Sequence, residues 1–398
     1  MSINKITQIR FSQYKRFAGT ETFDIKPITI LVGKNSSGKS SVTKLLPILS
    51  LSFNGTLKDT PMVYESENVS LGNSYESVCH NGNKIELAFG ASFENGLSID
   101  VSLMVGNDEE MLISQYSIHI NGNTYDLLYS NKLKAYECIQ THKTYDRSDF
   151  VGFVNEKLFD ELGIDKNLKQ KIDYIGPFRQ IPEPYMKYKV GSDLENVGAK
   201  GEKSYYMLYK NPELVNMVSK WFEENFEGCK LKVANVSTDP NTFQIKLSKP
   251  DNNAYWTNIV DEGQGTAQIL PIVTRGLKSV PDSIIVIEQP ELHLHPAAHE
   301  GVAKLLAKTT KANRHSYIIE THSENIILGI RDAIVDKSID FNANDVVIYY
   351  VDCDEEGAYL DKITIDEQGM LSKWPDGVFN ESYELLTKIM HKAQNTAQ

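Results

Sequence analysis

The segment Gly33–Ser40, with the sequence GKNSSGKS, most constrains the fold of this chain. It matches the pattern G-x-x-x-x-G-K-[ST] and follows Ile28–Val32, an apolar, β-branched run that predicts a buried strand. After the segment, Val42, Leu45 and Leu46 recur at helical spacing. A glycine loop between a strand and a helix N-terminus directs backbone N–H groups and the helix dipole at an anion. The sequence therefore predicts an α/β fold that binds a nucleoside triphosphate.

Each residue of the loop has an expected role in holding the triphosphate. We expect Lys39 to reach the outer phosphates and the Ser40 hydroxyl to complete the shell of a Mg²⁺ ion. The residues expected to bind the nucleotide here are Gly33, Lys34, Asn35, Ser36, Ser37, Gly38, Lys39, Ser40 and Ser41. The alternative, a chance glycine turn, is disfavoured because false matches seldom lie between a strand and a helix.

The composition narrows the class of protein. The chain has 398 residues, more than a single hydrophobic core usually organises. This length suggests two domains or one large domain with insertions. No apolar run approaches the roughly 20 residues that a membrane span needs. The N-terminus lacks the apolar core of a signal peptide, and the four cysteines include no C-x-x-C pair. A net charge of −12 argues against nonspecific nucleic-acid binding but leaves room for a local basic groove. These features favour a cytoplasmic protein.

The hydrophobic pattern divides the chain into three parts. Residues 1–83 form an N-terminal lobe with the phosphate loop, residues 84–172 an inserted β-rich arm with a helical segment, and residues 173–398 a C-terminal lobe. Asn-Gly pairs at 81–82 and 121–122 are strong hairpin signals beside the strands of the arm. The chain is expected to end in a β hairpin around 355–357, the Trp-Pro-Asp-Gly break at 374–377 and a helix over 381–393.

A second strand supplies the acidic partner that a phosphate loop requires. Ser283–Ile287 is an apolar, β-branched run typical of a central parallel strand. Glu288 follows it directly, where a carboxylate holds Mg²⁺ directly or through water. A surface carboxylate at a strand end is the less favoured alternative. Ser40 and Glu288 are therefore the predicted Mg²⁺ ligands.

Three further segments carry a resemblance to a known family. The sequence IEQPELHLHP at 287–296 resembles the Walker B and D-loop region of ABC-type ATPases related to the OLD family. VDEGQGTAQ at 260–268 resembles their signature motif, and IIETHS at 318–323 resembles their switch-histidine strand. The likeness spans nearly the whole chain in the expected order, and it is to a stand-alone ATPase subgroup without a Toprim domain. It implies an ABC-type ATPase head, a mixed sheet flanked by helices, with the arm and helical segment inserted.

The resemblance also implies cofactors and a dimer. The family closes a homodimer, or a higher homo-oligomer, around ATP and Mg²⁺. The signature residues Gly263, Gly265 and Thr266 of one subunit would face the γ-phosphate held by the other. Independently of the family, glycines before a helix expose N–H groups that suit an anion.

The resemblance assigns catalytic roles to Glu288, Gln289, Glu291 and His322. Gln289 stands where the family places its general base, and an amide cannot accept a proton from water, although it can orient that water by hydrogen bonds. Slow ATP hydrolysis is therefore expected, with Glu291 as a substitute base and His322 as a sensor of the γ-phosphate.

Two other clusters of metal-ligand residue types have simpler explanations. His293, His295 and His299 are loosely compatible with zinc, but the resemblance explains the first two as D-loop residues. The acidic residues at 352–356 could suggest the metal site of a nuclease. The chain continues for about 75 residues beyond His322, too few for the Toprim domain of OLD nucleases, and a solvated hairpin turn explains them better.

The favoured function is an ATP-driven switch whose dimerisation controls a separately encoded effector, a nuclease or a toxin, in antiphage defence or in DNA transactions. One alternative is a DNA-repair clamp ATPase of the RecF or SMC type, in which DNA would be a direct partner. A self-contained OLD-like nuclease is less favoured. No membrane partner is expected.

Overall fold

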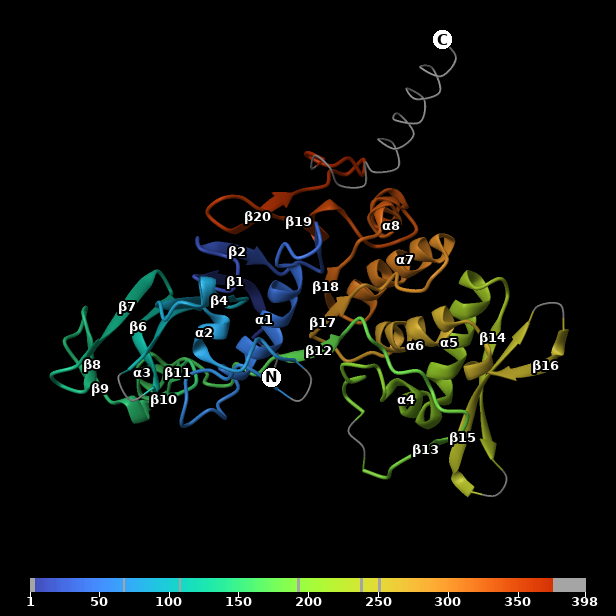
Figure 1. Cartoon of the computed structure of the whole chain (residues 1–398), viewed down its shortest axis with the longest axis horizontal. Coiled ribbons are helices and arrows are strands. Elements are labelled where there is room, and N and C mark those ends of the chain that lie inside the picture. The colour runs from blue at the N-terminus through green and yellow to red at the C-terminus, as the bar shows by residue number, and fades with distance from the viewer. Residues whose placement is uncertain are drawn as a thin grey trace, which may run out of the picture.

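The structure is a computed structural model that describes residues 4–66, 69–106, 109–191, 194–236, 239–249 and 252–374. A central sheet lies between a large antiparallel sheet on one side of the molecule and a small antiparallel sheet on the other (Figure 1). The predicted helix over 381–393 and most of the break before it lie outside the described residues.

The central sheet carries the phosphate loop. Its strand order is β12 (Lys171–Ile175), β17 (Ser283–Glu288), β18 (Ser316–Glu320), β3 (Ile28–Gly33), β19 (Val346–Cys353) and β20 (Ala358–Ile363). The first five strands are parallel, and β20 returns antiparallel to β19 through the predicted turn around 355–357. The expected mixed sheet and terminal hairpin are therefore confirmed.

Both faces of the central sheet are buried, so its parallel strands are apolar at successive positions. In β17, Ile284 and Val286 pack on the face that carries helix α1, whereas Ile285 and Ile287 pack on the face that carries α6, α7 and α8. The two faces give the molecule two hydrophobic cores.

The helices follow the amphipathic patterns of the sequence. Their bounds are α1 Lys39–Leu51, α2 Tyr75–Val78, α3 Glu156–Leu162, α4 Ser204–Lys210, α5 Pro212–Asn225, α6 Gln264–Leu277, α7 Pro296–Ala312 and α8 Glu324–Val335. Ser323 caps α8 by accepting a hydrogen bond from the Ile326 N–H.

The large antiparallel sheet packs on the α1 side of the core (Figure 1). Its strand order is β2 (Glu21–Asp24), β1 (Ile6–Ser12), β4 (Leu87–Phe93), β5 (Ser98–Val105), β6 (Met111–Ile120), β7 (Asn123–Ser130), β8 (Ala135–Cys138) and β9 (Thr144–Tyr145). Because β1 pairs with β4, this sheet crosses the predicted boundary between residues 83 and 84. The three-part domain division stays a prediction.

One of the two Asn-Gly pairs forms a hairpin. Asn121-Gly122 joins β6 to β7, as predicted. The prediction of a hairpin at Asn81-Gly82 is wrong. These residues belong to a 3₁₀ turn, His80–Gly82, that joins α2 to β4. The chain before this turn bonds to the loop around Tyr14 instead of to the strand that follows.

The smaller elements complete the fold. A short hairpin, β10 (Phe150–Val151) and β11 (Val154–Asn155), precedes α3. The small antiparallel sheet on the α6 side contains β13 (Met186–Lys187), β14 (Lys230–Val236), β15 (Asp239–Lys249) and β16 (Asn252–Asn258). The observed architecture is the expected α/β class: a mixed sheet flanked by helices, with added β and helical segments.

Candidate functional site

The phosphate loop joins the carboxyl end of β3 to the N-terminus of α1, and both of its fixed glycines are sterically required. Gly33 has φ 147°, and an added Cβ would lie 2.2 Å from the Val351 carbonyl oxygen. Gly38, the N-cap of α1, has φ 115°, and an added Cβ would lie 3.2 Å from the Phe17 ring. The N-terminus of α1 therefore opens directly onto the loop, where its N–H groups and dipole favour an anion.

Lys39 is buried at the start of α1. Its Nζ donates to the carbonyl oxygens of Gly33 at 2.9 Å and Lys34 at 2.6 Å. Burial lowers the pKa of Lys39, and the nearby Glu320 carboxylate opposes that shift. The ammonium group thus lies against the phosphate loop, and its contact with the outer phosphates stays a prediction.

Two carboxylates lie side by side at the carboxyl edge of the central sheet. Glu288 ends β17 and Glu320 ends β18, and the two residues pair in register. Side chains alternate along a strand, so Glu288 shares a face with Val286, and Glu320 shares a face with Ile318. Both apolar residues belong to the core on the α1 side, and both carboxylates therefore point toward α1.

Hydroxyl groups connect these carboxylates to the phosphate loop and its helix. Ser40 Oγ donates to Glu320 Oε1 at 3.0 Å, and Thr43 Oγ1 donates to Glu288 Oε1 at 2.8 Å. The Tyr174 hydroxyl donates to the same Glu288 oxygen at 2.9 Å. A hydroxyl beside two carboxylates is an all-oxygen donor set, which fits Mg²⁺. Burial, together with the neighbouring Glu288 carboxylate, raises the pKa of Glu320 to about 7.

Gln289 of the 287–296 segment and His322 of the 318–323 segment meet the phosphate loop at one pocket. This pocket is lined by Arg16, Asn35, Ser36, Gly38, Lys39, Ser40, Ser41, Gln289, Glu320 and His322. Gln289 has φ 47°, and its N–H donates to the Glu320 carbonyl oxygen at 2.7 Å, so the chain turns sharply after β17. Partial desolvation lowers the pKa of His322, and the positive charge of Lys39 lowers it further. The ring is therefore neutral at neutral pH and can accept or donate one hydrogen bond.

Glu291 braces the loop that carries His322. Its carboxylate accepts a hydrogen bond from Thr321 Oγ1 at 2.8 Å and another from the His322 N–H at 2.7 Å. The side chain therefore determines where the predicted sensor lies. Glu291 is not among the residues that line the pocket, so its predicted role as a base stays a prediction.

A buried arginine connects the Walker B turn to helix α6. Arg179 Nη2 donates to the carbonyl oxygens of Glu288 at 2.5 Å and Gln289 at 3.0 Å. The Arg179 carbonyl oxygen accepts from Gln268 Nε2 at 3.1 Å, and Gln268 belongs to α6. Burial lowers the pKa of Arg179 to about 10, which leaves it charged at neutral pH. A movement of α6 would therefore be transmitted directly to the turn that contains Gln289.

The signature residues lie at the start of α6. Gly263 is its exposed N-cap, and an added Cβ there would meet no atom within 4 Å. Gly265 packs closely on the His293 carbonyl oxygen, which would lie 2.5 Å from an added Cβ. Neither glycine, nor Thr266, lines the phosphate-loop pocket of the same chain.

The alternative histidine cluster does not form. His293 and His295 are exposed, and His295 caps α7 through its side chain, whereas His299 is buried and hydrogen-bonded to Ser323 Oγ at 2.8 Å. Within the described ranges, no group of three or more His, Cys, Asp or Glu residues is arranged to hold a metal ion. The acidic turn after β19 closes on itself through the Asp354 N–H and the Gly357 carbonyl oxygen.

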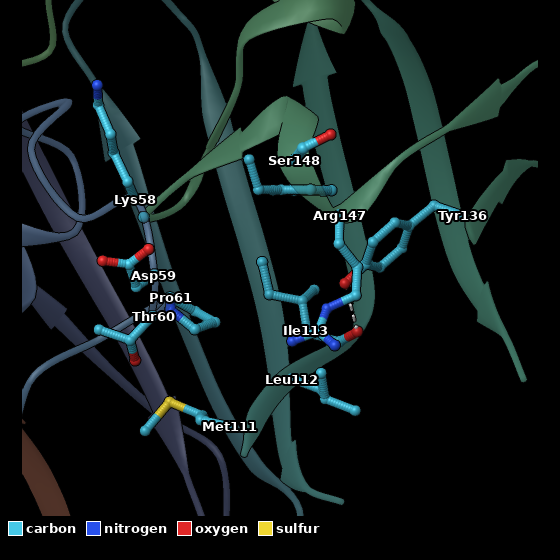
Figure 2. A pocket seen from close by; sticks show the side chains of 12 residues that line it. Lys58, Asp59, Thr60, Pro61, Met111, Leu112, Ile113, Tyr136, Arg147 and Ser148 are labelled. Atoms are coloured by element: carbon cyan, nitrogen blue, oxygen red, sulfur yellow. Dashed lines mark hydrogen bonds between the residues drawn. The ribbon is translucent and has the colours of Figure 1, made fainter. Parts of the chain in front are cut away.

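A separate pocket lies in the antiparallel arm (Figure 2). Lys58 and Asp59 come from one side, and Tyr136 and Arg147 from the other. The Arg147 guanidinium is paired with Glu110 at 3.1 Å.

Five residues at or behind the pocket carry no role in the sequence interpretation: Arg16, Thr43, Tyr174, Arg179 and Glu320. Glu320 had the clearest signal, since it lies inside the IIETHS segment, two residues before the switch histidine. Arg16, whose guanidinium donates to the Ser36 carbonyl oxygen, lies in a turn that resembles no motif.

Together the fold and the site define a phosphate-loop ATPase of the AAA type. The chain belongs to the family described as "AAA domain, putative AbiEii toxin, Type IV TA system", whose profile matches residues 28–328. Residues 341–389 match a second family, a protein of unknown function named DUF3696. ATP binding is thus a family property, whereas the closer relation to the OLD family stays a prediction.

Solved structures similar to this chain include heads of SMC proteins. The SMC head domain from Thermotoga maritima is 11% identical with a TM-score of 0.44, covering 90% of this chain and 98% of that one. An Smc head bound to the C-terminal domain of ScpA, derived from Pyrococcus furiosus, is 11% identical with a TM-score of 0.47, covering 98% and 100%. Among curated proteins, none matches. In the described part of the chain, no helix has the length and apolarity to cross a membrane.

Proposed function

We propose that this chain is a slow ATPase that closes into a homodimer on ATP and thereby controls a separately encoded effector. The observation that carries the proposal is the division of the motifs in space. Lys39, Gln289 and His322 meet at one pocket, whereas the signature glycines lie outside it at an exposed helix N-terminus. A second copy that supplies this N-terminus to the γ-phosphate would complete the site.

Slow hydrolysis follows from the groups at the pocket. Gln289 lines it, and its amide can orient a water molecule but cannot take the proton from it. Glu291 remains the proposed base, and in this arrangement both of its carboxylate oxygens already accept hydrogen bonds. Its use as a base would require the switch loop to move. A slow step of this kind would prolong the ATP-bound dimer.

The family description supports a role in defence, because it names a putative toxin of a toxin–antitoxin system. We propose antiphage defence as the setting. The net charge of −12 favours a protein effector over autonomous DNA binding, which would need a concentrated basic surface.

The dimer is tested by Gly263→Asp. Asp is a preferred N-cap residue and an added Cβ meets no atom within 4 Å, so the monomer should fold normally. A carboxylate facing the γ-phosphate of a partner would cost several kcal/mol, and we expect ATP-dependent dimerisation to weaken by at least about 100-fold. Analytical ultracentrifugation with and without ATP measures this change.

Gly263→Ser is the matched control, because it adds a neutral N-cap of similar size. It should retain the ATP-dependent dimer, and both variants should bind ATP as monomers. Dimerisation of Gly263→Asp at the wild-type ATP concentration would contradict the shared site.

The hydrolysis roles are tested by Gln289→Ala and Glu291→Gln. We expect each substitution to reduce the steady-state ATPase rate by about 10- to 100-fold. A displacement of the attacking water, or of His322, by about 1 Å is enough to slow hydrolysis by this factor. Phosphate release at saturating ATP measures the rate. Rapid hydrolysis in Gln289→Ala, together with an unchanged rate in Glu291→Gln, would refute both roles.

A further inference from the structure

Ser40 of the phosphate loop contacts the carboxylate of Glu320 and not that of Glu288, the acidic residue of the Walker B segment. Ser40 Oγ donates to Glu320 at 3.0 Å, although Ser40 and Glu320 are 280 residues apart. Glu288, at the end of the Walker B strand, accepts instead from Thr43 and Tyr174, both through Oε1. Thr43 lies almost one turn further along α1 than Ser40, so Glu288 is held deeper behind the loop.

Strand register explains this arrangement. Glu288 and Glu320 pair in register on β17 and β18, and β18 lies between β17 and the phosphate-loop strand β3. The strand nearer the loop therefore presents Glu320 to Ser40, and the more distant strand presents Glu288 to Tyr174. Thr43 Oγ1 contacts both carboxylates, at 2.8 Å from Glu288 Oε1 and at 3.5 Å from Glu320 Oε2.

The pair of carboxylates has no direct cationic partner among the described side chains. The described ion pairs include neither residue, and the nearby Lys39 Nζ bonds to the carbonyl oxygens of Gly33 and Lys34. Both carboxylates are buried. Two buried like charges side by side repel each other, and a divalent cation bound between them would remove this repulsion.

We propose that Glu320, together with Ser40, is the residue that holds the divalent cation of bound ATP, and that Glu288 supports it from behind. This inference rests on the proposed ATP-binding function and assigns a metal-site role to the strand before the switch histidine. Glu320 is only two residues before His322 in the chain. Loss of the cation with the leaving nucleotide would therefore free Glu320 and directly affect the position of His322.

The test compares Glu320→Gln with Glu288→Gln, two isosteric changes. Mn²⁺ is titrated into protein saturated with a non-hydrolysable ATP analogue, and bound Mn²⁺ is measured by electron paramagnetic resonance. We expect Glu320→Gln to raise the half-saturating Mn²⁺ concentration by about 10- to 100-fold, and Glu288→Gln to raise it less. Glu324→Gln, an exposed position in the first turn of α8, should match the wild type.

Binding of a fluorescent ATP analogue in EDTA separates the metal from the nucleotide. Glu320→Gln should bind the analogue at least as tightly as the wild type there, because a negative charge beside the phosphates has gone. A half-saturating Mn²⁺ concentration within twofold of the wild type in Glu320→Gln would overturn the inference. A wild-type chain that binds no analogue under either condition would instead overturn the proposed function.

Discussion

Lys39→Ala is expected to reduce ATP affinity by about 10- to 150-fold, because a charge-assisted hydrogen bond to an anion contributes about 1.5–3 kcal/mol and is lost together with the charge. Lys39 is the buried cation of the phosphate loop, and its Nζ rests on the carbonyl oxygens of Gly33 and Lys34. The alanine variant loses both the phosphate contact and these two braces of the loop. Isothermal titration calorimetry with ATP and Mg²⁺ measures the change in affinity.

Lys308→Ala is the matched control, since Lys308 is an exposed lysine on α7, remote in sequence from the loop. It should bind ATP as the wild type does. If Lys39→Ala is folded by circular dichroism and keeps wild-type affinity, the triphosphate does not bind at this loop.

Arg275→Met is expected to lower the free energy of unfolding by about 3–5 kcal/mol, the usual cost of leaving one partner of a buried ion pair uncompensated. Arg275 Nε donates to Asp173 Oδ2 at 2.6 Å, and both residues are buried. The same carboxylate oxygen accepts from the Val197 N–H at 3.2 Å. This pair attaches helix α6 to β12 at the edge of the central sheet, so the substitution also loosens the helix that carries the signature residues. Urea unfolding followed by circular dichroism measures the loss.

Two further variants calibrate this result. Lys220→Met removes one partner of an exposed i,i+4 pair with Glu224 at 3.9 Å and should cost at most about 0.5 kcal/mol. The double variant Asp173→Asn, Arg275→Met should recover part of the single-variant loss, because no buried charge remains. A loss below about 1 kcal/mol in Arg275→Met would show that the Asp173 charge finds other compensation.

The local parts of the fold were predictable because their causes are local. The phosphate loop, the strand Ser283–Glu288 and the helices α5 to α8 follow from apolar periodicity, caps and glycines within a few residues of one another. The two Asn-Gly pairs mark the limit of this reasoning. Both pairs adopt left-handed conformations, but only the one at 121–122 has two strands free to pair across it. The segment before Asn81 is bonded to the loop around Tyr14, about 65 residues earlier in the chain.

The long-range pairings had no signal in the sequence. β1 pairs with β4 across the whole phosphate loop and its helix, which joins the N-terminal hairpin to the arm. Arg179 is a similar case, since its guanidinium binds main-chain carbonyl oxygens about 110 residues later, and carbonyl groups are present at every position. No residue pattern distinguishes these partners from others.

The sequence by itself determined that this chain holds a phosphate loop with an acidic strand end opposite it, because both motifs are contiguous and their chemistry is carried by neighbouring backbone and side chains. Only the tertiary structure decided which carboxylate meets Ser40. That contact depends on the order of strands β17, β18 and β3 and on their register, which are set by the packing of two buried sheet faces. Residues that lie far apart in the chain therefore share the site through the sheet, and Glu320 takes the place beside the serine.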